Sequence, residues 1–272
     1  MINERLRPAR LLRGSGIEIG ALHRPLPLPL RARVTYVDRM PVEKLRQHYA
    51  ELADLDLTAV DVIGSAEDLS AFGSGSLDFV IANHLIEHLE DPIVGLKEFH
   101  RVLHARGLLF MCVPDARVTF DRLRPLTTVD HLLAEHRGGR PAVAANRRSH
   151  YEDWVANVEC SGVLGDLHRP DTAAGPEGLV KKLLDMDYSI HFHCWHADTF
   201  LDFFRIACRE EHLDFEVLDA VDTTGNGRDE LILLAGKRPS AFQRMRAKGW
   251  RATLKTTPIG PALVRARHLV SR

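Results

Sequence analysis

Short apolar runs of strand-like composition recur about every 15–25 residues in the first part of the chain, and helix-compatible stretches lie between some of them. The clearest such stretch is Ile93–Leu103, which Asp91 opens as an N-cap and Pro92 as a first-turn residue. Alternating strands and helices predict βαβ units and therefore a mostly parallel sheet. The strand-like runs are Gly16–Ile19, Val34–Val37, Val60–Ile63, Leu77–Ala82 and Gly107–Val113, and a further helix is expected at Val42–Leu52.

The connection after the first predicted strand is unusual. Pro25, Pro27 and Pro29 alternate with Leu residues at the place where the first crossover helix would lie. Proline lacks the backbone N–H and blocks a regular helix, so alternating prolines exclude one here. We expect the link from Gly20 to Val34 to be extended or to contain a single short turn.

The periodicity lapses after Val113 and returns near residue 196. The intervening part is rich in Arg, His, Asp, Gly and Pro, with only weak helical patches such as Val129–Glu135. We interpret it as an insertion at the carboxyl ends of the strands, where it would cover a substrate. The predicted divisions are 1–113, a cofactor-binding half; 114–195, a substrate-binding insertion; 196–238, a closing helix (Asp198–Glu210) and two antiparallel strands (Phe215–Asp219 and Glu230–Gly236) with a turn at Asn226-Gly227; and 239–272, a basic tail.

Charge is distributed unevenly along the chain. The formal net charge is −1, yet no acidic residue follows Glu230, while residues 237–272 carry ten Lys or Arg. Apolar side chains lie among these cations, so we expect the tail to contact an anionic membrane surface, pack on the acidic body or remain solvated. No nucleic-acid-binding module is recognisable, so no nucleic-acid partner is expected. Four cysteines without a CxxC pair, a charged N-terminus and no membrane-length apolar run predict a cytoplasmic protein.

Carboxylates follow the first three predicted strands, at the edge where open α/β sheets bind ligands. Asp38 ends the second strand, where a carboxylate typically grips the ribose hydroxyls of a nucleoside cofactor. The first strand ends in Glu18-Ile19-Gly20, with one glycine where a dinucleotide site needs three. A carboxylate there would repel a pyrophosphate, but it suits the ammonium group of a methionine moiety.

These motifs, taken in order, resemble those of the class I S-adenosylmethionine-dependent methyltransferases. The matching elements are the E-x-G turn, the ribose-binding acid, the Gly64–Leu69 segment and H-x-x-E-H-x-x-D-P from His84 to Pro92. The resemblance implies a doubly wound, seven-stranded, mostly parallel α/β sheet and S-adenosylmethionine as cofactor. It implies the following cofactor contacts: Glu18, Gly20, Asp38, Arg39, Ser65, Ala66, Glu67, Asn83, His84 and His88.

The insertion is the better place for substrate chemistry. We expect His150 to act as general base because a neutral imidazole can take a proton near pH 7, with Glu152 orienting it and Asp115 as an alternative base or metal ligand. Mg²⁺ is left open as a second cofactor, held by Asp115, Asp121 or Glu152. His191 and His193 would share one face of an extended segment, but an adjacent third ligand is lacking, which disfavours zinc.

The insertion also resembles a bacterial subgroup of these methyltransferases that accompanies polysaccharide assembly. That resemblance implies O-methylation of a carbohydrate hydroxyl, and in its narrowest form 1-O-methylation of a mannoside in methylmannose polysaccharide synthesis. Two alternatives stay open. One is a methyltransferase of a small non-sugar acceptor, and the other is a cofactor-binding regulatory protein that docks on membranes through its tail. The oligomeric state is not predicted.

Overall fold

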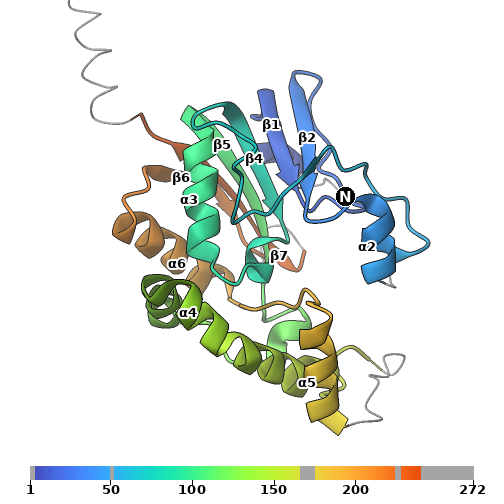
Figure 1. Cartoon of the computed structure of the whole chain (residues 1–272). Coiled ribbons are helices and arrows are strands. Elements are labelled where there is room, and N and C mark those ends of the chain that lie inside the picture. Colours follow the sequence, from blue (N-terminus) through green and yellow to red (C-terminus); the bar gives the residue numbers. More distant parts are fainter. Residues whose placement is uncertain (1–3, 50–51, 166–174, 224–227, 240–272) are drawn as a thin grey trace, which may run out of the picture. The chain divides into compact units, whose positions relative to one another are not determined.

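The computed structural model of this chain describes residues 4–49, 52–165, 175–223 and 228–239. Its central feature is a seven-stranded sheet with the order β3-β2-β1-β4-β5-β7-β6 (Figure 1). The first five strands in this order, β3, β2, β1, β4 and β5, pair in parallel, whereas β7 lies antiparallel to both β5 and β6. The strands are β1 Gly14–Ile19, β2 Ala32–Asp38, β3 Val62–Ile63, β4 Leu77–Asn83, β5 Leu103–Pro114, β6 Phe215–Val221 and β7 Glu230–Lys237. This order confirms the predicted fold class.

The helices are α1 Leu6–Ala9, α2 Val42–His48, α3 Pro92–Val102, α4 Val129–Trp154, α5 Gly175–Asp185 and α6 Ala197–Glu210. Helix α3 begins as predicted, because the Asp91 side chain accepts hydrogen bonds from the backbone N–H groups of Ile93 and Val94, both at 3.1 Å. The proline-rich link between β1 and β2 contains no helix, also as predicted.

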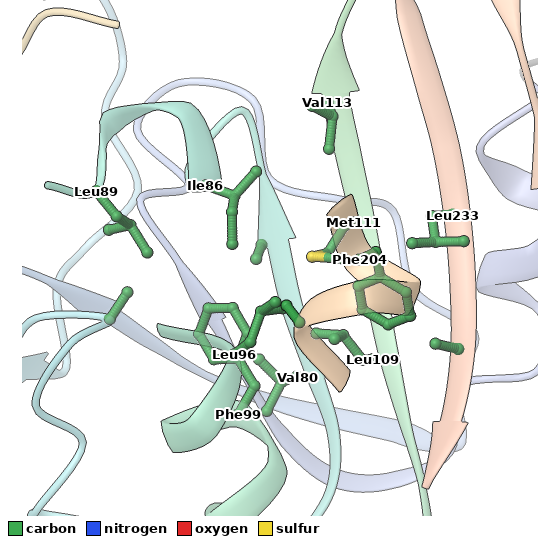
Figure 2. Close-up of a cluster of buried hydrophobic side chains, with 14 of the residues drawn as sticks. Val80, Ile86, Leu89, Leu96, Phe99, Leu109, Met111, Val113, Phe204 and Leu233 are labelled. Carbon is green, nitrogen blue, oxygen red and sulfur yellow. The ribbon is translucent and has the colours of Figure 1, made fainter. Parts of the chain in front are cut away.

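Both faces of the sheet are covered. On one face, side chains of β4, β5 and β7 pack against α3 and α6 in the larger core, with Phe99 and Phe204 at its centre (Figure 2). On the other face, Phe79 and Phe110 pack with Leu12, which follows α1, and with Leu26 of the proline-rich link. That link therefore takes the covering role that a crossover helix has elsewhere in such folds.

The segment between β5 and α6 leaves and rejoins the sheet at one point. Asp115 pairs with Trp195, and the backbone N–H of Ala116 donates to the Trp195 carbonyl at 2.8 Å. Between these ends, α4 contacts α3, α5 and α6, and Figure 1 shows α4 running below the sheet with α5 beside its far end. The predicted helical patch at Val129–Glu135 lies within α4, which is longer than expected: it spans 26 residues with one kink at Gly139, whose φ is +63°.

Strands β6 and β7 are antiparallel as predicted, whereas the predicted turn at Asn226-Gly227 lies outside the described residues. The described residues up to Lys237 form one compact unit, and all but the first residue of the basic tail (239–272) lie outside the described part. None of the helices in the described ranges combines the length and apolar character needed to cross a membrane.

Candidate functional site

A cavity of about 400 Å³ opens at the carboxyl ends of β1, β2 and β4. The chain order reverses here, since β1 has β2 on one side and β4 on the other, and such switch points are where open α/β sheets bind ligands. Eight of the ten predicted cofactor residues line this cavity: Gly20, Asp38, Arg39, Ser65, Ala66, Glu67, His84 and His88.

The end of the cavity near β2 carries groups suited to a nucleoside. Asp38 ends β2, and its Oδ1 accepts a hydrogen bond from the Arg39 backbone N–H at 2.7 Å. Burial raises the pKa of this carboxyl. Gly20 follows β1 with φ +69°, a left-handed conformation that glycine adopts without steric cost. After β3, the Glu67 carboxylate accepts from the Asp91 backbone N–H at 2.8 Å, which ties this wall to the start of α3.

Glu18 and Asn83 are not among the residues that line the cavity. The Glu18 carboxylate is buried and accepts hydrogen bonds from the Leu26 backbone N–H at 3.0 and 3.1 Å. Leu26 lies between Pro25 and Pro27, so its N–H is the donor that this part of the link retains. Burial raises the pKa of Glu18 to about 7. The structure therefore assigns Glu18 to holding the proline-rich link, where the sequence predicted a cofactor contact.

His84 connects the cavity to a buried ion-pair network. Its Nε2 lies 2.8 Å from Glu230 Oε2, and Arg5 Nε donates to Glu230 Oε1 at 2.6 Å. Although burial favours the protonated acid, Arg5 and His84 lower the pKa of Glu230 to about 2. Sequence reasoning missed Arg5 and Glu230 because 225 positions separate them and neither belongs to a local motif.

The three predicted catalytic residues lie in different environments. Asp115 is buried and accepts from the Ala197 backbone N–H at 3.1 Å and from Arg117 Nε at 2.9 Å, so it anchors the start of α6. Glu152 is exposed and pairs with Arg148 one helical turn away. The prediction that Glu152 orients His150 is therefore wrong.

Glu135 takes the place expected of Glu152, because its Oε1 lies 3.3 Å from His150 Nε2. His150 is not among the cavity-lining residues. The ring of Phe192, which does line the cavity, packs edge-on against the His150 ring, with 5.9 Å between the ring centroids. His150 thus lies in a cluster beside the cavity. Its ring also contacts those of His131 and His193.

His191 and His193 do not form one site. His193 joins His131 and His150, whereas His191 joins Glu87 and His88. In each of these two groups, the potential ligand atoms lie within 4.8 Å of one another. The predicted magnesium ligands also have different partners. Asp121 pairs with Arg124 and His191, neither of which is a partner given above for Asp115 or Glu152.

Further cavity-lining residues come from segments that the motif search did not single out as a site. Tyr49 follows α2, and Tyr188 and Ser189 follow α5. The Ser189 hydroxyl lies 3.1 Å from His88 Nδ1. The sequence signal at these positions is weak, because only tertiary folding brings the end of α5 to the strand ends.

Residues 13–111 match the family model described as a methyltransferase domain. Similar solved structures include a possible histamine N-methyltransferase of Thermotoga maritima, at 17% identity over 88% of this chain and 89% of that one, with TM-score 0.42. A putative methyltransferase of Bacillus halodurans has 15% identity over 87% and 98%, with TM-score 0.43. The 1,6-didemethyltoxoflavin-N1-methyltransferase of Burkholderia thailandensis has 14% identity over 88% and 80%, with TM-score 0.43. No curated protein matches the chain.

The matched segment runs from the residue before β1 into β5 and contains all eight predicted cofactor residues that line the cavity. The strand order places their side chains at one edge of the sheet. Residues 13–111, which hold these cavity-lining residues, thus resemble a methyltransferase domain.

Proposed function

We propose that this protein is an S-adenosylmethionine-dependent methyltransferase and that it transfers the methyl group to a hydroxyl group of a carbohydrate. The observation that carries this proposal is the polarity of the cavity-lining residues outside the predicted cofactor set. Carboxylates, hydroxyls and aromatic rings line the cavity together: Glu90, Tyr151, Asp187, Tyr188 and Ser189. Carboxylate and hydroxyl oxygens accept hydrogen bonds from sugar hydroxyls, while aromatic rings pack on the apolar face of a sugar ring.

The predicted cofactor residues that line the cavity fit S-adenosylmethionine. We assign Asp38 to the ribose hydroxyls and Ser65, Ala66 and Glu67 to the adenine, with Gly20 allowing close approach of the backbone. The bound cofactor supplies an electrophilic methyl group on sulfur. The protein aligns the acceptor oxygen with that methyl group, and alignment alone accounts for a large share of such a rate enhancement.

Two other acceptors or roles remain as alternatives to test. A small aromatic or quinone acceptor needs no carboxylates in the cavity wall, whereas Glu90 and Asp187 line this cavity. A membrane-docking role would rest on the basic tail, which lies almost wholly outside the described residues. Peripheral membrane contact through residues 239–272 stays a prediction, and vesicle binding with and without those residues tests it.

The acceptor class is tested by measuring S-adenosylhomocysteine release from the full chain with mannosides, other glycosides and small aromatic acceptors. We expect turnover with glycosides. Glu90→Gln should lower kcat/KM for the sugar about tenfold or more, because it removes a charged hydrogen-bond acceptor from the wall. Its affinity for S-adenosylhomocysteine, measured by calorimetry, should be unchanged.

Two controls make this result interpretable. Asp202→Asn removes an exposed carboxylate on α6 and should leave turnover unchanged. Asp38→Ala should weaken S-adenosylhomocysteine binding roughly 10–100-fold, since it removes the acceptor for the ribose hydroxyls. Methylation of aromatic acceptors with no turnover of any glycoside would contradict the carbohydrate assignment.

A further inference from the structure

The Glu87 carboxylate is the least explained polar group beside the cavity. It lies in the 3₁₀ turn Ile86–His88, directly after β4, and is 1% exposed. Neither carboxylate oxygen accepts a hydrogen bond from another residue in the described part of the chain. Burying a carboxylate without partners is costly, and buried charges in proteins are normally paired or bound to a metal ion.

Three imidazole rings lie beside this carboxylate. His84 Nδ1 lies 3.7 Å from Glu87 Oε1, while His88 and His191 have their outer nitrogens already engaged. His88 Nδ1 lies 2.9 Å from the Ile190 carbonyl oxygen, and His191 Nδ1 lies 2.7 Å from Asp121 Oδ2. When Nδ1 donates its proton to such an acceptor, the ring presents the Nε2 lone pair on its other side. His191 Nε2 lies 4.0 Å from Glu87 Oε1.

This arrangement has the outer contacts that metal-binding histidines usually have. A metal-ligating histidine almost always donates its other N–H to a carboxylate or a backbone carbonyl, which fixes the tautomer and the ring orientation. Asp121 supplies the carboxylate for His191 and is itself held by Arg124 at 2.9 Å, while Ile190 supplies the carbonyl for His88.

We propose that Glu87, His88 and His191 bind a divalent transition-metal ion, with Zn²⁺ as the preferred ion. Their ligand atoms lie within 4.8 Å of one another, and two imidazoles with one carboxylate suit zinc rather than Mg²⁺, which prefers oxygen ligands. Bonds of about 2.0–2.1 Å hold the ligands of a tetrahedral ion about 3.4 Å apart, so the three side chains would draw together on binding.

The position of the site suggests what the ion would do. His88 also lines the cavity, so an ion held by these three residues would lie beside the cavity. A sugar hydroxyl bound there would be oriented and made more acidic, which would replace the expected base in the insertion. This role rests on the proposed function, whereas metal binding by the three residues does not.

The other cluster, His131, His150 and His193, is a weaker candidate. Its carboxylate Glu135 lies 3.2 Å from His131 Nε2 and 3.3 Å from His150 Nε2, and it also accepts from Asn146. Glu135 Oε1 therefore has hydrogen-bond partners without an ion, whereas neither oxygen of Glu87 has one in the described part of the chain. This cluster makes a matched control for the metal site.

Metal binding is tested on the full chain after dialysis against a chelator. Zn²⁺ is titrated in competition with a chromogenic chelator, and Co²⁺ is added separately to record the visible absorption of the bound ion. We expect one tightly bound equivalent and a Co²⁺ spectrum typical of four or five nitrogen and oxygen ligands. Glu87→Gln and His191→Gln should each weaken Zn²⁺ binding about 100-fold, whereas His131→Gln should bind like the unmodified protein.

Calorimetry with S-adenosylhomocysteine, together with circular dichroism, shows whether each variant is folded. The proposal is overturned if the unmodified protein binds no stoichiometric Zn²⁺, or if His131→Gln rather than His191→Gln loses the ion. These measurements need no acceptor. Zn²⁺ binding without methylation of any glycoside would therefore refute the proposed function alone, and glycoside methylation without Zn²⁺ binding would refute the metal site alone.

Discussion

At the scale of single residues, burial reverses the usual behaviour of Glu18. Burial raises the pKa of Glu18 to about 7, compared with 4.5 for an ordinary Glu side chain. Between pH 4.5 and about 7 the folded state therefore binds more protons than the unfolded state. Stability from this group is present at low pH and is lost as pH rises through about 7. In the unmodified protein, ionisation of Glu18 should lower the free energy of unfolding by roughly 1–3 kcal/mol between pH 5 and 8. We expect this decrease to be absent in Glu18→Gln, as measured by urea denaturation.

The informative quantity is the difference in free energy of unfolding between Glu18→Gln and the unmodified protein at each pH. His193, whose pKa burial lowers to about 3, contributes a change of opposite sign below about pH 6.5, but it does so equally in both. Glu230, with a pKa of about 2, stays ionised throughout this range. Parallel stability curves for Glu18→Gln and the unmodified protein would show that Glu18 is ionised without penalty.

At the scale of elements, Asp91 joins two helices and one loop. Its Oδ1 caps α3, its Oδ2 lies 2.8 Å from His136 Nδ1 on α4, and its backbone N–H donates to Glu67. Asp91→Ala should lower the free energy of unfolding by about 1–2 kcal/mol, whereas Asp91→Asn, which keeps a capping oxygen, should lose less. Asp198→Ala, an exposed first-turn change in α6, is the control and should stay within about 0.5 kcal/mol. Equal stability of Asp91→Ala and Asp198→Ala in urea would contradict this role.

At the scale of the whole molecule, Arg124 holds the inserted segment together. Its buried guanidinium donates to Asp153 at 2.7 Å, to Asp121 at 2.9 Å and to the His191 carbonyl at 2.8 Å, so it joins three separate stretches. Arg124→Met leaves these acceptors without their donor, and breaking such a buried pair costs about 3–5 kcal/mol. We expect proteases to cut within 115–195 much faster, while S-adenosylhomocysteine still binds.

Arg205→Met provides the comparison for that variant, because Arg205 pairs with Asp202 on the exposed face of α6. Its cleavage rate should match that of the unmodified protein. If Arg124→Met were cleaved no faster than Arg205→Met, the insertion would be held by its apolar contacts rather than by the buried guanidinium. Those contacts centre on Tyr151 and Trp154.

Local sequence patterns determined the succession of strands along the chain, the helix start at Asp91 and most of the cavity-lining residues near the end of β2. These features depend on neighbours within a few positions, such as an apolar run followed by a carboxylate. Helix α4 was underestimated because Gly138, Gly139 and Pro141 normally break helices, and here a kink at Gly139 absorbs them.

The sequence by itself determined the α/β class and placed the predicted cofactor residues at the carboxyl ends of the strands, because both follow from short-range periodicity. Only the tertiary structure decided which polar groups share a site. Glu18 faces Leu26 rather than the cavity, Glu135 rather than Glu152 reaches His150, and His191 meets Glu87 from 104 positions away. Burial and pairing depend on contacts between distant segments, and no local pattern encodes which segments will meet.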